Sequence, residues 1–167
     1  MRLFVLIVLS LAVAACSGFQ TPEQPSFYLD IATGAKLDAD AAASMISGYR
    51  KNNGLSDVAL DPDLTRMAQA QAEAMAKRDK LEHNIKTPFV ARLKASGYSA
   101  KQAAENIGAG YHTLAEAFSG WRDSPPHRAN MLLKGATRMG IAAIYTPTSK
   151  YKVYWALILA APDDRKS

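Results

Sequence analysis

The amino-acid sequence predicts an α+β domain built in three layers, helix, sheet and helix. Helix-forming patterns come first in the chain, and two apolar runs rich in β-branched and aromatic residues, 139–145 and 153–159, lie near its end. The turn-forming letters TPTSK fall between the two runs, which predicts an antiparallel hairpin. Because the second run is apolar almost without interruption, we expect a central strand that helices cover on both faces.

The predicted helices are marked by their capping residues. Asp40 is expected to cap a first helix that stops at Asn53-Gly54, and Asp61-Pro62 is expected to start a second helix that runs to about residue 81. A third helix is expected over 88–96, with Phe89, Val90 and Leu93 inward and Gly97 as its cap. An extended segment around Glu105 follows. The last two predicted elements before the hairpin are a fourth helix over 114–121, with Trp121 in the core, and a short helix or turn over 127–133.

The first fifteen residues have the pattern of a secretory signal peptide. Arg2 precedes an apolar run that reaches Val13, and small residues follow before Cys16. The run is too short to span a bilayer comfortably, since a transmembrane helix needs roughly 20 apolar residues. We therefore expect residues 1–15 to be cleaved on export.

Cys16, the only cysteine in the chain, ends the letters VAAC, which resemble a bacterial lipobox. Such a cysteine carries a diacylglycerol, and its acyl chains hold the protein to a membrane. By resemblance to the sorting rules of Gram-negative lipoproteins, Ser17 points to the periplasmic face of the outer membrane. We interpret residues 16–36 as a lipidated N-terminus and flexible tether, 37–162 as the folded domain and 163–167 as a polar tail.

Composition restricts the class of partner. With Cys16 lipidated the mature chain has no disulfide, so the core alone must stabilise an exported domain of about 150 residues, which is large enough to do so. The formal net charge is +5, and the basic residues are scattered rather than gathered in a block. This pattern indicates no nucleic-acid site. The positive excess is compatible with anionic lipid or wall polymer, and more simply with an ordinary solvated surface.

Four motifs, taken in order along the chain, carry a family resemblance. They are a helix end at Tyr49-Arg50, the helix DPDLTRMAQAQAEAMA before His83, the letters AENI around Glu105, and WRDSPPHRANML followed by MGIA. Together they resemble the CAP superfamily of cysteine-rich secretory proteins, venom antigens and plant pathogenesis-related proteins, and in particular its bacterial SCP-like branch. The resemblance covers roughly residues 38–160 and implies the CAP fold, a three-layer α-β-α sandwich with a small antiparallel sheet.

The resemblance also implies a cleft in which two histidines and two acidic residues meet and can hold a divalent metal, often zinc. His83 matches the first histidine, Glu105 the acid of AENI, and His127 the second histidine. Eukaryotic members place a glutamate three residues after the helix Trp, where this chain has a serine. The fourth cleft position therefore stays open between Asp123, Glu116, Ser124 and water.

The residue types at these positions allow three functions. Two imidazoles and a carboxylate match the ligands of several catalytic zinc sites, and without metal a histidine paired with Glu105 can act as a general base. Ser124, before two prolines, is typical of a turn or cap rather than a nucleophile. We expect first a cleft that binds a small molecule, lipid, cell-wall ligand or divalent cation such as zinc, second a metal-assisted hydrolase of an envelope substrate, and third a non-catalytic scaffold or wall-contact module.

Each polar residue also has a purely structural alternative. His83 could cap carbonyls at a helix end, Glu105 could accept from backbone donors near the glycine-rich turn, and His127 could simply begin a short helix. Convergence of the three side chains in space would favour a site. Arg128 and Asn130 are expected to fix the loop by hydrogen bonds, with a place at the rim of the cleft as the alternative for Arg128.

Overall fold

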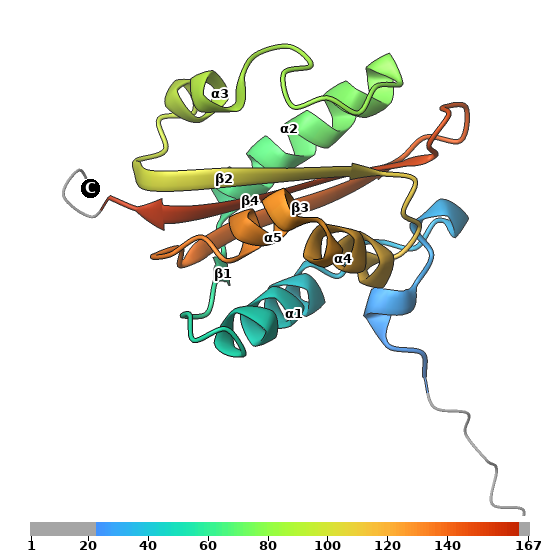
Figure 1. The fold of residues 1–167 in the computed structure, drawn as a ribbon. Coiled ribbons are helices and arrows are strands. Elements are labelled where there is room, and N and C mark those ends of the chain that lie inside the picture. Colours follow the sequence, from blue (N-terminus) through green and yellow to red (C-terminus); the bar gives the residue numbers. More distant parts are fainter. Residues whose placement is uncertain (1–22, 164–167) are drawn as a thin grey trace, which may run out of the picture.

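The computed structural model describes residues 23–163, so the predicted leader, Cys16 and most of the polar tail lie outside the described residues. The elements in chain order are η1 (Ser26–Tyr28), η2 (Ile31–Thr33), α1 (Ala39–Lys51), β1 (Ala59–Leu60), α2 (Pro62–Arg78), α3 (Phe89–Ala95), β2 (Ala100–Ala109), α4 (Leu114–Asp123), α5 (Pro125–Met131), β3 (Arg138–Tyr145) and β4 (Val153–Pro162). Helices α2 and α3 cover one face of the sheet, and α1, α4 and α5 cover the other (Figure 1). The three-layer α+β prediction is confirmed.

The sheet has four strands in the order β1-β3-β4-β2. β3 and β4 form the predicted antiparallel hairpin, with Tyr145 opposite Val153 and Arg138 opposite Ala160. β2 pairs antiparallel with the other side of β4. The short strand β1, which the sequence analysis did not predict, pairs parallel with β3, so the sheet is mixed at this edge.

The central strand β4 separates two hydrophobic clusters. Alternate residues of the strand belong to different clusters, because successive side chains point to opposite faces of a sheet. Residues packed with α1, α4 and α5 are Val153, Trp155, Leu157 and Leu159, and residues packed with α2 are Tyr154, Ala156, Ile158 and Ala160. The prediction of a strand buried on both faces is confirmed.

Two helix boundaries differ from the predicted ones. The N-cap of α1 is Asp38, whose side chain accepts from the Ala41 N–H, rather than Asp40. α2 begins as predicted at the Asp61 cap, but it ends at Arg78 instead of near residue 81. The reason is a tertiary contact: Asp79 takes a left-handed conformation with φ 51°, and its carboxylate accepts from the Lys150 N–H and the Tyr154 hydroxyl of the hairpin. His83 therefore lies in a loop, several residues beyond the helix.

The short helix α3 is only partly inserted into the core. Phe89 and Leu93 pack against the α2 cluster as expected. Val90 does not, because it is 74% exposed, so its predicted inward position is wrong. Gly97 follows the helix with φ 73°, the left-handed conformation expected of a terminating glycine.

The N-terminal segment contacts the domain well before α1. Ile31 is buried, and its N–H donates to the His112 carbonyl at 2.9 Å. The Ser26 hydroxyl donates to Asp38 at 2.6 Å, next to the start of α1. These contacts shorten the stretch that can serve as a free tether, and the lipidation prediction concerns residues outside those described. No helix within residues 23–163 is long and apolar enough to cross a membrane.

The MGIA motif has a packing role between α2 and the sheet. A Cβ atom at Gly140 of β3 would lie 2.1 Å from the Leu64 carbonyl carbon and 2.2 Å from the Thr65 nitrogen. Glycine is therefore required for the backbone of α2 to approach the strand. This close approach fixes α2, and with it the loop that carries His83.

Candidate functional site

The polar residues of the AENI motif lie at one edge of the sheet. β2 pairs with β4 on one side only, and successive residues of the strand point to opposite faces. Glu105 contacts Arg92 of α3, in the layer that also holds α2. Asn106 instead contacts α5, in the opposite layer, by donating to the His127 carbonyl at 2.9 Å. A site at this edge can therefore draw groups from both layers.

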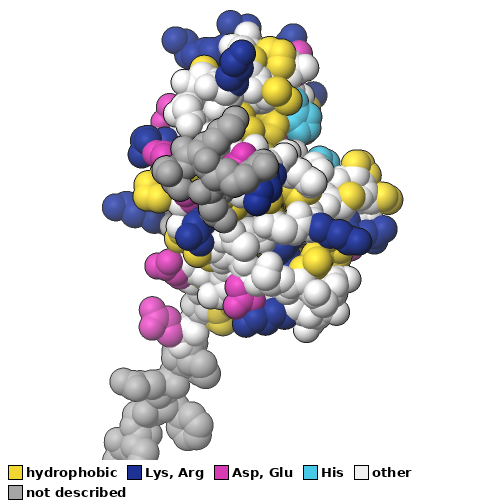
Figure 2. Space-filling view, turned by 90° about the vertical axis from the view of Figure 1, so that its left-hand side faces the viewer, with side chains coloured by type: hydrophobic (Ala, Val, Ile, Leu, Met, Phe, Trp, Pro, Cys, Tyr) yellow, Lys and Arg dark blue, Asp and Glu magenta, His cyan; other side chains and the backbone are white. Residues whose placement is uncertain are grey.

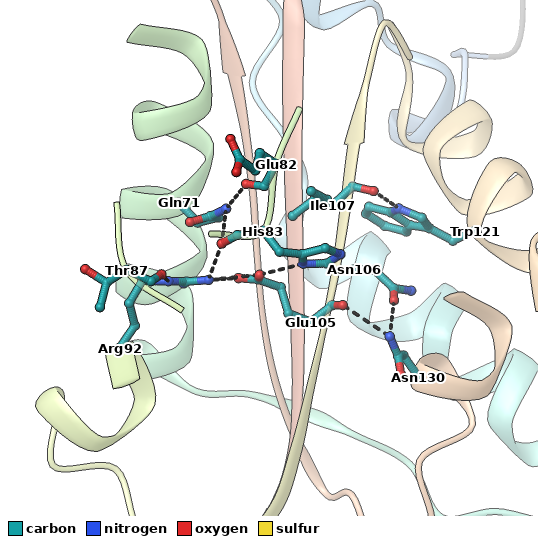
Figure 3. A network of polar contacts seen from close by, with 10 residues as sticks. All are labelled: Gln71, Glu82, His83, Thr87, Arg92, Glu105, Asn106, Ile107, Trp121 and Asn130. Atoms are coloured by element: carbon teal, nitrogen blue, oxygen red, sulfur yellow. Dashed lines mark hydrogen bonds and ion pairs between the residues drawn. The ribbon is translucent and has the colours of Figure 1, made fainter. Parts of the chain in front are cut away.

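Two side chains of the WRDSPPHRANML motif cap the outward carbonyls of β2. Trp121 Nε1 donates to the Ile107 carbonyl at 3.0 Å, and Asn130 Nδ2 donates to the Glu105 carbonyl at 3.2 Å and to Asn106 Oδ1 at 2.9 Å (Figure 3). An uncapped strand edge is a template for pairing with another chain, so these bonds close the edge and fix α4 and α5 against it. The expected hydrogen-bonding role of Asn130 and core position of Trp121 are confirmed.

His83 is held by its backbone and by one ring nitrogen. Gln71 Nε2, from α2, donates to the Glu82 carbonyl at 2.9 Å and the His83 carbonyl at 3.2 Å, which fixes the loop. The His83 Nδ1 lies 2.9 Å from Glu105 Oε1. The His83 side chain is 46% exposed whereas that of Glu105 is 1% exposed, so the imidazole stands between a buried carboxylate and the solvent.

Arg92 of α3 is the second partner of Glu105, and the sequence analysis did not identify it. Its Nη2 lies 2.9 Å from Oε1 and 2.7 Å from Oε2 of the carboxylate. Its Nε donates to the Thr87 carbonyl at 3.2 Å, and its guanidinium carbon lies 5.4 Å from the centre of the Phe89 ring. A buried carboxylate needs a charged or hydrogen-bonding partner, and Arg92 supplies both.

His127 belongs to the same region from the opposite layer. Burial, and second the charge of His83, lower the pKa of His127 below its ordinary value. The structure thus pairs the side chains of His83 and Glu105 and places the His127 backbone beside Asn106, while the three-residue cleft implied by the resemblance stays a prediction. We call the group His83, Arg92, Glu105, Asn106 and His127 the edge site. The face drawn in Figure 2 shows Lys and Arg side chains scattered over the surface, and no single basic block appears on it.

The three side chains considered for the fourth position do not contact Glu105. Glu116 completes a capping box with Thr113 at the start of α4, and Asp123 pairs with its neighbour Arg122. Both line a separate hollow of about 600 Å³ with Tyr111 and His112. Ser124 joins α4 to α5 and makes no side-chain capping bond, and nothing places its hydroxyl at the edge site. The residue that contacts Glu105 beside His83 is a cation, Arg92.

The donor set does not fit a zinc site that uses Glu105 as a ligand. Both carboxylate oxygens are within hydrogen-bond distance of Arg92, and one also contacts His83. Within residues 23–163, no group of three or more His, Asp, Glu or Cys side chains converges to hold a metal ion. The zinc prediction stays a prediction.

The arrangement resembles an oriented imidazole more than a ligand shell. An ionised carboxylate can only accept, so a hydrogen bond to Glu105 places the hydrogen of a neutral His83 ring on Nδ1, an assignment made from the network. Nε2 then keeps its lone pair, and no described residue donates to it. This nitrogen can accept a hydrogen bond from a ligand or a water molecule.

Arg92 could not be recognised in the sequence because its surroundings are ordinary. It stands in the letters FVARLKA, a short amphipathic pattern in which an arginine is expected on the solvent side. The two clues that existed were the absence of a second acid in register and the position of this helix between His83 and Glu105. Gln71, inside the alanine-rich α2, gave no sign of its bonds to the His83 loop either.

An α-β-α sandwich with a His-Glu pair at its sheet edge defines a class of protein. Comparison with known families places the chain within that class: the cysteine-rich secretory protein family, CAP, matches residues 43–159, and the chain belongs to this family. The uncharacterized protein YkwD of Bacillus subtilis (strain 168) is 32% identical over 103 residues, which are 60% of this chain and 40% of that relative. The chain thus spans well under half of the relative's length.

Solved structures show the same fold at low sequence identity. An outer surface protein from Borrelia burgdorferi superposes with a TM-score of 0.68 at 18% identity, covering 75% of this chain and 93% of that one. An extracellular protein containing an SCP domain from Bacillus anthracis gives a TM-score of 0.63 at 20% identity, covering 72% of this chain and 39% of that one. Both support the fold assignment, and both are described as extracellular or surface proteins.

Proposed function

We propose that this chain is an exported, lipid-anchored CAP-domain protein whose edge site binds a small ligand of the cell envelope. The leader pattern over residues 1–15 and the lipobox-like VAAC before Ser17 support export and anchoring through Cys16, at the periplasmic face of the outer membrane. The surface and extracellular location of structurally similar proteins agrees with export.

The observation that carries the binding proposal is the orientation of His83. A carboxylate that is 1% exposed and paired with Arg92 holds one ring nitrogen, and the ring itself is half exposed. This is more organisation than a surface histidine needs. The purely capping alternative for His83 is disfavoured, because the imidazole contacts the side chain of Glu105, 22 residues away, rather than the carbonyls of α2.

The chemistry of Nε2 indicates the kind of group that binds. A neutral imidazole with its hydrogen on Nδ1 accepts a hydrogen bond at Nε2, so the matching group is a hydroxyl or an amide N–H. Sugars and peptides of the cell wall carry both groups. We therefore favour a wall fragment over a lipid, whose main contribution would be an apolar chain, for a site formed by polar side chains.

The proposal is tested by titrating soluble peptidoglycan fragments into residues 17–167 while the imidazole nitrogens are observed by NMR. We expect the His83 Nε2 signal to move first in the wild type, and fragment binding measured by calorimetry to be lost in His83→Gln. His112→Gln is the matched control, because His112 lies in the separate hollow and should leave binding unchanged. Equal calorimetric affinity for the fragments in wild type and His83→Gln would refute a role for the edge site.

One observation favours a second function, hydrolysis of an envelope substrate. The Glu105 to His83 pair has the geometry of a general base held by an orienting carboxylate, with Nε2 available for a water molecule. Turnover of ester, peptide or glycan substrates that disappears in His83→Gln would support it. If neither binding nor turnover depends on His83, the remaining candidate is the scaffold or wall-contact module.

A further inference from the structure

Arg92 is fixed at Glu105 by contacts on several sides. Its Nη2 contacts both carboxylate oxygens and also lies 3.4 Å from the His83 carbonyl, while Nε is bonded to the Thr87 carbonyl. The ring of Phe89 packs against the guanidinium. The Arg92 side chain is only 18% exposed. These contacts and this burial restrict the conformations of the Arg92 side chain more than those of a solvent-exposed arginine.

The contact with Arg92 neutralises the negative charge of Glu105, which a bound cation would need. Glu105 is the one carboxylate of the edge site, and its charge is compensated at 2.7 Å by the guanidinium. Oε1 already accepts from two groups, His83 and Arg92. A divalent cation placed on Glu105 would also lie within a few ångströms of the positive guanidinium, and repulsion at that distance is strong in a partly buried site.

The contrast with the ligand set implied by family resemblance is one of charge. That set has two acidic residues beside two histidines, which gives a doubly negative site. Here Glu116 and Asp123, the acids considered for the fourth cleft position, line the separate hollow with Tyr111 and His112. The group that contacts Glu105 is a cation. The formal charge of the carboxylate and its non-histidine partner is therefore zero rather than minus two.

We propose that Arg92 sets the charge preference of the edge site: by neutralising Glu105 it excludes divalent cations from that carboxylate and reserves His83 for an uncharged ligand. The inference deepens the proposed function and rests on it for the identity of the binding surface. It does not depend on which wall fragment binds. The test below uses zinc alone as its probe.

The test is calorimetric titration of zinc into residues 17–167 and into two substitutions of one side chain. Arg92→Gln keeps a hydrogen-bond donor for Glu105 but removes the charge, and Arg92→Lys keeps the charge. We expect zinc to bind at least about tenfold more tightly to Arg92→Gln than to wild type, and the Lys variant to resemble wild type. Equal zinc affinity in wild type and Arg92→Gln, both folded by circular dichroism, would overturn the inference.

A second measurement holds even if the Arg92 variants do not fold. Zinc binding to the wild type is compared with Glu105→Gln, which is nearly the same size. If Arg92 excludes the cation, Glu105 is not a ligand and the substitution does not weaken zinc binding. A loss of about tenfold or more would show that zinc reaches Glu105 past Arg92, and the inference would fail. Wall-fragment binding is measured in a separate experiment. A failure of the proposed function is therefore seen as absence of fragment binding, independently of the zinc result.

Discussion

Two arginines of this domain, the fully buried Arg50 and the partly exposed Arg92, are held in opposite ways. Arg50, at the end of α1, is 0% exposed and donates only to carbonyls, those of Ser56, Met131, Leu133 and Ala136, at 2.8 to 3.0 Å. Arg92 is partly exposed and contacts a carboxylate, and its Nη1 is a buried donor without a partner among the described residues.

The difference separates an arginine that only stabilises the fold from one at the proposed ligand site. Carbonyls at the end of α5 have no partner within their helix, and Arg50 satisfies them while joining α1 to the segment before β3. Each of its three side-chain nitrogens donates to a carbonyl inside the fold. Its complete burial lowers the pKa of the Arg50 guanidinium below the ordinary value. Arg92, by contrast, controls the charge of a side chain that contacts a half-exposed histidine.

The largest effect is expected for Arg50→Met. The substitution leaves several buried carbonyls without a donor, and each such group costs about 1–3 kcal/mol, partly relieved by water. We expect the free energy of unfolding to fall by about 4 kcal/mol in urea denaturation, with no change at the edge site. Arg50→Lys, which keeps the charge and some donors, should lose less. A loss below about 1 kcal/mol for Arg50→Met would contradict the structural role.

Substitution of Arg92 is expected to lower the free energy of unfolding by a smaller amount, and this loss should be coupled to Glu105. Removing one partner of a buried ion pair leaves the other charge unpaired, and because Arg92 is partly exposed we expect Arg92→Met to cost about 2–3 kcal/mol. The measurement is a double-mutant cycle with Glu105→Gln. The double variant should lose at least about 1 kcal/mol less than the sum of the single losses. Additive losses would mean that the two side chains do not act as a pair.

Asn130→Ala is expected to cost about 1 kcal/mol. The variant loses the bonds from Asn130 Nδ2 to the Glu105 carbonyl and to Asn106 Oδ1, which tie α5 to the strand edge. Hydrogen exchange should report faster opening of α5, while α2 stays protected. Asn84→Ala, an exposed asparagine in the loop that carries His83, is the control and should be neutral.

The smallest effect is expected for the way in which stability depends on pH through the protonation of His127. Its pKa is lowered by burial and by His83, so the folded state favours the neutral ring. The stability contributed by this preference is present above pH 6.5, the ordinary value, and is lost as pH falls through the lowered pKa. NMR titration should give a His127 pKa below 6.5 that rises only partly in His83→Gln, because burial is the first cause. A rise to the ordinary value would mean that His83 dominates.

Much of the fold could be predicted from the sequence because the relevant signals are local. Asp61-Pro62 marks the start of α2, and the apolar run of β4 indicates a strand covered on both faces. The end of α2 could not be predicted, because Asp79 is held by Lys150 and Tyr154 from the distant hairpin. Strand β1 is too short for any periodicity.

The candidate site, like the fold, could be predicted from the sequence only in part. His83, Glu105 and His127 were singled out through motif resemblance; the structure pairs the side chains of His83 and Glu105 and places the His127 carbonyl beside Asn106 of the same strand. What a motif cannot supply is the charge of a neighbour that arrives from another helix. Arg92 is 13 residues from Glu105 in the chain and carries no motif of its own. It nevertheless decides whether the carboxylate is a free ligand or a paired charge.

The most direct test of this account is the tautomer of His83, read from imidazole nitrogen shifts in residues 17–167 at neutral pH. An ionised Glu105 paired with Arg92 predicts a hydrogen on Nδ1 and a free lone pair on Nε2, with this preference lost in Glu105→Ala. A hydrogen on Nε2 in the wild type, unchanged by Glu105→Ala, would show that the carboxylate does not orient the ring, and the ligand site proposed at the strand edge would lose its basis.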